Sequence, residues 1–235
     1  MTSPSAPQPT TQTECSQPPA ARTFPVHHHP TSSAPDPQLR LETLLVRSGT
    51  GTDPATGAIT TPIHLSTAYG HPGLGESTGY DYTRTASPTR DVLQDALARL
   101  EGGTAAFALS SGMAALELVT RTLAPHGSRI VALRDLYGGS FRFLEVLAEE
   151  GAADVDFVLG LEGLRGALAG PADLVIIETP TNPMMEEISI PEAAELAHAA
   201  GAKLVVDNTF YTPVVQRPLE LGADVVVHSG TKYLG

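Results

Sequence analysis

Apolar and polar positions follow two regular patterns along the chain from about residue 88 onward. Apolar residues recur at the spacing of amphipathic helices over residues 88–101, 112–123, 141–150 and 191–200. Short continuous apolar runs, which are typical of buried strands, occupy residues 130–133, 155–159, 174–177, 204–206 and 225–227. Strands of this kind separated by helices predict an α/β fold with a mostly parallel sheet covered by helices on both faces.

Two helix starts also carry local signals. Ser87 is expected to cap a helix that begins at Pro88 and ends at the glycine pair 102–103. A second helix is expected to open at residues 110–113, directly after the apolar stretch 105–109.

Polar and small residues follow the predicted strands where each one ends. They are Asp135 and Tyr137, residues 178–182, Asp207, and residues 228–232. Ligands of open parallel sheets bind outside the carboxyl ends of the strands. We therefore expect an aromatic ring, an amide, a carboxylate and an amine to converge on one rim of the sheet.

The amine belongs to Lys232, which follows the apolar run 224–227. The chain has only two lysines among its 14 cationic residues, and the rest are arginine. A guanidinium stays protonated and cannot attack a carbonyl, whereas a lysine amine can form a Schiff base. Lys232 is therefore a candidate nucleophile, and the alternative is a strand-end lysine that extends into solvent.

Pyridoxal phosphate is the common aldehyde cofactor that a lysine holds. Its pyridine nitrogen must stay protonated, and Asp207 at a strand end is the candidate partner for that nitrogen. The alternative is that Asp207 caps the segment that follows it.

The cofactor's phosphate needs backbone N–H groups at a helix N-terminus together with hydroxyl groups. Gly112 would allow the phosphate close to the backbone, and Ser229 and Thr231 flank Lys232 closely enough to contribute. Tyr137 could lay its ring over the cofactor. An ordinary helix cap and a packing tyrosine are the alternatives for these two features.

Composition limits the possible partners. The formal net charge of -12 argues against nucleic acid and against an anionic membrane surface. No apolar run is long enough to cross a bilayer, and the N-terminus lacks a signal-peptide pattern. Cys15 is the single cysteine, which excludes disulfide scaffolds and cysteine-ligated zinc and favours a reducing, cytoplasmic setting.

The first 38 residues differ from the rest of the chain. Nine of the 20 prolines fall there, so we expect residues 1–38 to form a disordered proline-rich tail. The three histidines 27–29 in this flexible segment are not expected to form a rigid metal site, and no metal is predicted elsewhere.

Six motifs in order resemble the trans-sulfuration enzymes of cysteine and methionine metabolism. They cover residues 82–90, 110–115, 135–139, 178–183, 206–210 and 228–233. The resemblance runs from about Leu41 to the end of the chain. Within the family, residues 65–69, 75–80 and 210–213 are most similar to bacterial cystathionine gamma-synthases that also act as O-acetylhomoserine thiolyases.

The resemblance implies a fold-type I pyridoxal phosphate enzyme, similar to aspartate aminotransferase, that works as a homodimer or homotetramer. Residues 39–87 would form an arm that contributes to the neighbouring subunit's site, and residues 88–235 would form an incomplete large cofactor-binding domain. The missing C-terminal part would carry the arginine that binds the substrate carboxylate, so we expect an N-terminal fragment.

The resemblance also assigns roles to single residues. Lys232 would bind the aldehyde, Asp207 the pyridine nitrogen and Asn182 the phenolic oxygen, while Tyr137 would stack on the ring and assist proton transfer. The implied phosphate ligands are Gly112, Met113, Ser229 and Thr231, with Tyr82 and Arg84 reaching a neighbour's phosphate.

The implied reaction is carbon–sulfur bond formation by gamma-replacement on an O-acylhomoserine, in methionine and cysteine biosynthesis. Cystathionine beta- or gamma-lyase activity is an alternative, and a non-catalytic truncated remnant is another. Gly139 stands where methionine-degrading lyases of the group place a reactive cysteine, which disfavours that activity. A Rossmann nucleotide-binding module is disfavoured because its glycine fingerprint needs a third glycine after Gly49 and Gly51, and the chain has none there. A serine hydrolase is disfavoured because Ser111 does not lie in a Gly-x-Ser-x-Gly motif.

Overall fold

The computed structural model describes residues 39–51, 53 and 55–234. The expected disordered tail of residues 1–38, with Cys15 and the three histidines, lies outside the described residues. No helix among the residues described is both long enough and apolar enough to cross a membrane.

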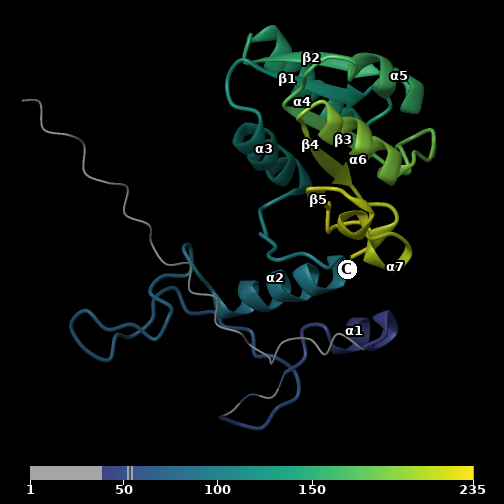
Figure 1. The fold of residues 1–235 in the computed structure, drawn as a ribbon. Helices are drawn as coiled ribbons and strands as arrows, with labels where there is room; N and C mark the ends of the chain where they lie inside the picture. Colours follow the sequence, from purple (N-terminus) through teal and green to yellow (C-terminus); the bar gives the residue numbers. More distant parts are fainter. Residues whose placement is uncertain (1–38, 52, 54, 235) are drawn as a thin grey trace, which may run out of the picture.

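A five-stranded parallel sheet forms the centre of the chain (Figure 1). Its strands are β1 (Ser128–Leu133), β2 (Ala153–Val158), β3 (Leu174–Glu178), β4 (Lys203–Asp207) and β5 (Val225–Val227). The strand order is β2-β1-β3-β4-β5, and every pair is parallel. The chain therefore builds outward in opposite directions from β1 and β3, and this pair is the switch point where such sheets bind ligands.

Helices cover both faces of the sheet, as the sequence predicts. α3 (Gly112–Leu123) and α4 (Gly138–Glu149) pack on one face, while α5 (Gly160–Ala167) and α6 (Ile190–Ala199) pack on the other. Figure 1 shows α2 (Pro88–Glu101) beyond the β5 edge, near the end of the chain. Three short helices complete the order: α1 (Leu41–Arg47), α7 (Thr212–Val215) and the 3-10 helix Pro218–Leu221.

The core lies on the two faces of the sheet. All five residues of β3 are buried, as are the central residues of β1 and β4. Arg129 of β1 holds the β2 edge of the sheet in place, because its guanidinium donates to Asp156 of β2 and to the carbonyl oxygens of Ala167 and Pro171. The sheet is thus held by burial along its length and by one multidentate arginine at the β2 side.

Local signals located α2 and α3 well but α5 was missed. Ser111 caps α3 by accepting the Ala114 N–H at 3.0 Å. Ser87 occupies the capping position of α2, but its side chain makes no capping hydrogen bond, so the expected cap is only positional. Helix α5 was missed because three of its eight residues are glycines, which weaken its helical pattern.

The segment between α1 and α2 extends away from the sheet (Figure 1). It is held by two isolated bridges, Thr50 to Thr60 and Ala68 to Tyr82. Apolar side chains on it are exposed, with Ile63 at 77% and Leu65 at 91%. Large exposed apolar side chains clustered on one segment indicate a surface that lacks its packing partner.

Candidate active site

The carboxyl ends of the parallel strands place most of the predicted site residues on one rim. Asp207 ends β4 and is the register partner of Glu178 at the end of β3 and of Val227 at the end of β5. Tyr137 follows β1 by four residues, and Lys232 follows β5 by five. The carboxyl ends of the strands therefore carry groups that are far apart in sequence, such as Tyr137 after β1 and Lys232 after β5.

The N-terminus of α3 lies against the turn that follows β5. A Cβ atom added at Gly112 would come 2.8 Å from Cβ of Ser229 and 3.0 Å from its Cα, closer than real Cβ atoms approach. The first-turn N–H groups of Gly112 and Met113 have no partner within an α-helix and point out of its end. Glycine at this position therefore leaves a helix N-terminus open beside the hydroxyl of Ser229, which suits an anion.

The Lys232 amine lies in the same place. Its Nζ is 3.1 Å from Oγ of Ser229 and 3.3 Å from Oγ1 of Thr231. A backbone hydrogen bond from the Lys232 N–H to the Ser229 carbonyl, 3.2 Å long, closes the turn that carries all three residues. The predicted nucleophile and the two predicted hydroxyl ligands are thus neighbours.

Asp207 is tied to this turn through Thr209. The Thr209 N–H and Oγ1 both donate to Oδ1 of Asp207, at 3.0 and 2.5 Å. The same Oγ1 accepts the Ser229 N–H at 2.9 Å. Asp207 does cap the segment after it, as the alternative held, but this bond also fixes its carboxylate relative to the lysine turn.

Burial raises the pKa of Asp207, while the Thr209 hydrogen bonds and the positive charges of His228 and Lys232 act in the opposite direction. A half-buried carboxylate whose charged form is disfavoured by its surroundings gains from a cationic partner. A protonated pyridine nitrogen is such a partner.

Tyr137 directly precedes α4, at its capping position, and is 45% exposed. A Cβ atom at Gly139 would come 2.4 Å from the Tyr137 ring atom Cε1 and 3.1 Å from Sδ of Met113. The ring therefore lies over Gly139 and next to the first turn of α3. Glycine at position 139 leaves the room that this ring position requires.

Glu178 belongs to the same rim, although no role followed for it from the sequence. It is 5% exposed, and its Oε2 accepts the Tyr137 N–H at 2.6 Å. The backbone N–H of Asn182, in the loop after β3, also bonds this carboxyl group. Burial raises the pKa of Glu178 to about 8, and the charges of Asp207 and Asp135 add to that rise. The sequence does contain a signal for Glu178, because it is an acidic residue at the end of an otherwise apolar strand at the switch point.

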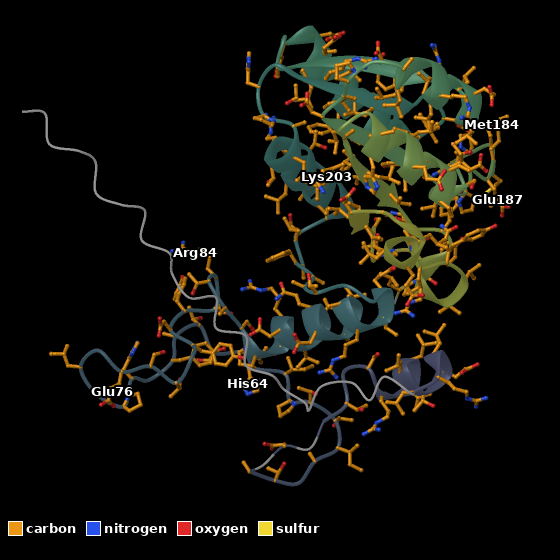
Figure 2. The ribbon with its side chains drawn as sticks, in the orientation of Figure 1. His64, Glu76, Arg84, Met184, Glu187 and Lys203 are labelled. Atoms are coloured by element: carbon orange, nitrogen blue, oxygen red, sulfur yellow. The ribbon has the colours of Figure 1, made fainter. Side chains whose placement is uncertain are left out.

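Tyr82 and Arg84 do not join this cluster within the chain. The Arg84 guanidinium carbon lies 5.0 Å from the centre of the Tyr82 ring, so the two residues contact each other. Figure 2 shows Arg84 on the extended segment, apart from the sheet and from the loop that carries Met184 and Glu187.

The residues on the rim fit pyridoxal phosphate. The cofactor needs an amine, a carboxylate, an aromatic ring and an anion-binding helix end, and the rim holds Lys232, the half-buried Asp207, Tyr137 and the Gly112 turn. No group of three or more potential metal ligands occurs among the residues that the structure describes.

Known proteins resemble this chain in sequence and in structure. It is 47% identical to the cystathionine gamma-synthase/O-acetylhomoserine (thiol)-lyase of Bacillus subtilis over 197 residues, 83% of this chain and 52% of that protein. It is 42% identical to a cystathionine beta-lyase of Lactococcus lactis subsp. cremoris, with the same coverage. A crystal structure of cystathionine gamma synthase from Xanthomonas oryzae pv. oryzae, in complex with aminoacrylate and cysteine, superimposes with a TM-score of 0.80 at 42% identity.

The last alignment covers 83% of this chain and 51% of the Xanthomonas chain. The chain thus spans about half the length of the curated relatives it matches. The sequence model of one enzyme family matches residues 42–235, which is most of the chain. Both the sequence resemblance and the expected cofactor are confirmed, and the chain belongs to the Cys/Met metabolism family of pyridoxal phosphate-dependent enzymes.

Proposed function

We propose that the protein forms a carbon–sulfur bond by gamma-replacement on an O-acylhomoserine, in methionine and cysteine biosynthesis. The observation that carries the proposal is the position of the Lys232 amine, between two hydroxyls and beside the open N-terminus of α3. Similarity to cystathionine gamma-synthases supports the reaction type. The single cysteine supports a reducing, cytoplasmic setting.

When bound, pyridoxal phosphate supplies an aldehyde that condenses with amines and a ring that withdraws electrons from the substrate. Lys232 would hold that aldehyde, and the N–H groups of Gly112 and Met113 would bind the phosphate with the hydroxyls of Ser229 and Thr231. Tyr137 would cover the ring, and Asn182 would donate to its phenolic oxygen. Asp207 would hold the proton on the ring nitrogen through its carboxylate.

The chain's own proton carriers would be Lys232 and Tyr137. The Nζ of Lys232 would accept the protons that leave the alpha and beta carbons of the substrate and return them later. The bond between the gamma carbon and the acyl oxygen would break, and the acyl group would leave as a carboxylate. The sulfur of the thiol would then bond to the gamma carbon, and its S–H proton would be released, so that the products are the thioether, the carboxylate and one proton. The Tyr137 hydroxyl would assist proton transfer at this stage.

Glu178 would keep the rim from carrying excess negative charge. It is the register partner of Asp207, and its pKa of about 8 leaves it largely uncharged at neutral pH. A neutral Glu178 still accepts the Tyr137 N–H through one oxygen. Asp207 can then ionise without a second carboxylate charge beside it.

Cleavage of cystathionine is the second candidate reaction. The 42% identity to a cystathionine beta-lyase supports it, since the motifs on the rim serve both reactions. Gly139 supports neither the synthase nor the cystathionine lyases over the other. It disfavours only the methionine cleavage that uses a reactive cysteine at that position, because a glycine there has no thiol.

A second copy of the chain would complete the site. We assign residues 39–87 to an arm and residues 88–235 to part of the cofactor-binding domain. The arm exposes apolar side chains such as Ile63 and Leu65, which would pack on the neighbouring subunit. Tyr82 and Arg84, which stack on each other, would reach the neighbour's phosphate.

Reduction with borohydride tests the nucleophile. Incubation of the purified protein with pyridoxal phosphate and then borohydride should attach one reduced cofactor to the peptide that contains Lys232. Lys232→Ala should abolish this product, because no other group on the rim is a primary amine. Lys203→Ala is the matched control, since Lys203 is the other lysine and is paired with Asp224. Labelling that persists in Lys232→Ala would refute the assignment.

Product analysis separates the two candidate reactions. An intact enzyme that contains this chain should convert O-acetylhomoserine and cysteine to cystathionine and acetate, and Lys232→Ala should lose this activity by at least about a thousandfold, as expected for a catalytic nucleophile. A lyase would instead release ammonia and a keto acid from cystathionine alone. Release of a keto acid without any synthesis would replace the proposed reaction with the second candidate.

Subunit complementation tests the shared site. Arg84→Ala removes the arm cation and Lys232→Ala removes the amine, so each variant alone should show little trapping at a limiting cofactor concentration. Hybrids obtained by co-expression should recover complete sites, about one quarter of the total for random dimers. Two copies of the same variant serve as the control. Recovery no greater than the sum of the separate variants would count against a site shared between subunits.

The raised pKa of Glu178 predicts a pH dependence of stability. The unfolded chain releases the Glu178 proton near pH 4.5, while the folded chain keeps it until about pH 8. Glu178 therefore favours the unfolded state increasingly as the pH rises through this window. The unfolding free energy of the wild type relative to Glu178→Gln should fall between pH 5 and 8, measured by urea denaturation. The same substitution at the exposed Glu145 is the control, and a flat difference for Glu178→Gln would contradict the account.

A further inference from the structure

Glu101 is a carboxylate buried at the end of α2. It is 5% exposed, and a charge so deeply buried needs hydrogen-bond partners. Its Oε1 bonds Nε2 of His228 at 2.5 Å and accepts Nδ2 of Asn208 at 3.2 Å. Its other oxygen, Oε2, is buried without a hydrogen-bond partner in the part of the chain that the structure describes, and so is Nδ1 of His228.

The two partners of Glu101 belong to the segments that carry the cofactor-binding groups. Asn208 directly follows Asp207, and His228 directly precedes the turn of Ser229, Thr231 and Lys232. The Asn208 N–H also donates to the Val227 carbonyl at 3.0 Å, so the two segments are already neighbours. One oxygen of Glu101 therefore links the end of β4 to the end of β5.

Asn208 is itself held in place by further bonds. Its side chain is fully buried, and its amide donates to the Gln216 carbonyl at 2.9 Å and accepts from Nε2 of Gln216 at 3.0 Å. The same Nε2 donates to the Thr179 carbonyl at 3.1 Å, just after β3. The network that begins at Glu101 therefore reaches the ends of three adjacent strands.

This arrangement is not explained by stability alone. A buried pair of a carboxylate and a histidine contributes little net stability, because the desolvation of both groups offsets their attraction. Among the described residues, Oε2 of Glu101 and Nδ1 of His228 also lack hydrogen-bond partners, which adds to the cost. What the pair does supply is a fixed position for the residues on either side of it.

We propose that Glu101 is a positioning residue for the cofactor site. Through His228 and Asn208 it holds the Lys232 turn at a set distance from Asp207. The inference rests on the proposed function, because it concerns the separation between the group that binds the aldehyde and the group that binds the ring nitrogen. Glu101 itself does not contact the cofactor.

Two substitutions separate this role from a general effect of the charge. Glu101→Gln keeps an oxygen that His228 and Asn208 can share, so the dissociation constant for pyridoxal phosphate should stay within about twofold of the wild-type value. Glu101→Leu removes the acceptor, and the dissociation constant should rise about 10- to 100-fold. Spectroscopic titration with pyridoxal phosphate measures both. Glu117→Leu is the control, because Glu117 forms an exposed ion pair with Arg121 on α3.

A second readout distinguishes positioning from loss of stability. Visible circular dichroism at saturating cofactor reports how rigidly the ring is held, whatever the affinity. The band should weaken in Glu101→Leu and be retained in Glu101→Gln and Glu117→Leu. If Glu101→Leu does not yield folded protein, His228→Leu removes half of the link and should shift both readouts in the same direction.

The outcomes divide clearly. Glu101→Leu protein with wild-type affinity and an unchanged dichroism band overturns the positioning role, and so does a Glu101→Gln variant as impaired as Glu101→Leu. Wild-type protein that binds pyridoxal phosphate at Lys232 while Glu101→Leu is unaffected overturns this inference alone. Wild-type protein that binds no pyridoxal phosphate overturns the proposed function as well.

Discussion

The close approach of the β5 end to the first turn of α3 is the contact on which the site depends. At Gly112 a Cβ atom would overlap the backbone and side chain of Ser229, so this approach exists only because the residue is glycine. The approach places the free N–H groups of a helix end, two hydroxyls and the Lys232 amine in one small volume. A change that widened this contact would separate the covalent anchor from the anion site, while the sheet and its core would remain intact.

Two acidic residues lie on the same rim, and the structure around them disfavours their negative charges. Glu178 and Asp207 are register partners on adjacent strands, and burial disfavours charge on both. The surroundings of the two carboxyl groups differ. Asp207 receives two bonds from Thr209 and faces the positive charges of His228 and Lys232, whereas Glu178 faces the negative charges of Asp207 and Asp135. Burial and these charges therefore raise the pKa of Glu178, which keeps its proton until about pH 8. At Asp207 the Thr209 hydrogen bonds act against the effect of burial, and a cationic ring nitrogen would favour the charged form further.

Local chemistry made much of this arrangement predictable from the sequence. Proline, glycine and serine mark the ends of α2 and α3, and apolar runs locate all five strands to within a few residues. The order of polar residues after those strands then predicts which groups share the rim. Two features could not be predicted in this way. The glycines of α5 hide its helical pattern, and the bond between Glu101 and His228 joins positions 127 residues apart, so it depends on how α2 packs beyond β5.

The two lysines of the chain show how position decides reactivity. Lys203 is the first residue of β4, so it lies at the amino ends of the strands, opposite to the rim. Its amine donates to Oδ1 of Asp224 at 2.8 Å. That carboxylate also bonds His198 and the Leu204 N–H, and these hydrogen bonds together lower the pKa of Asp224 although burial acts against them. Lys203 is therefore committed to a structural ion pair. Lys232 follows a strand of the same sheet at its other end, and its hydrogen-bond partners are hydroxyls, which hold an amine without neutralising it. Open parallel sheets bind ligands at the carboxyl ends of their strands. A lysine at the amino ends can therefore form a structural ion pair, while a lysine at the carboxyl ends is available for chemistry.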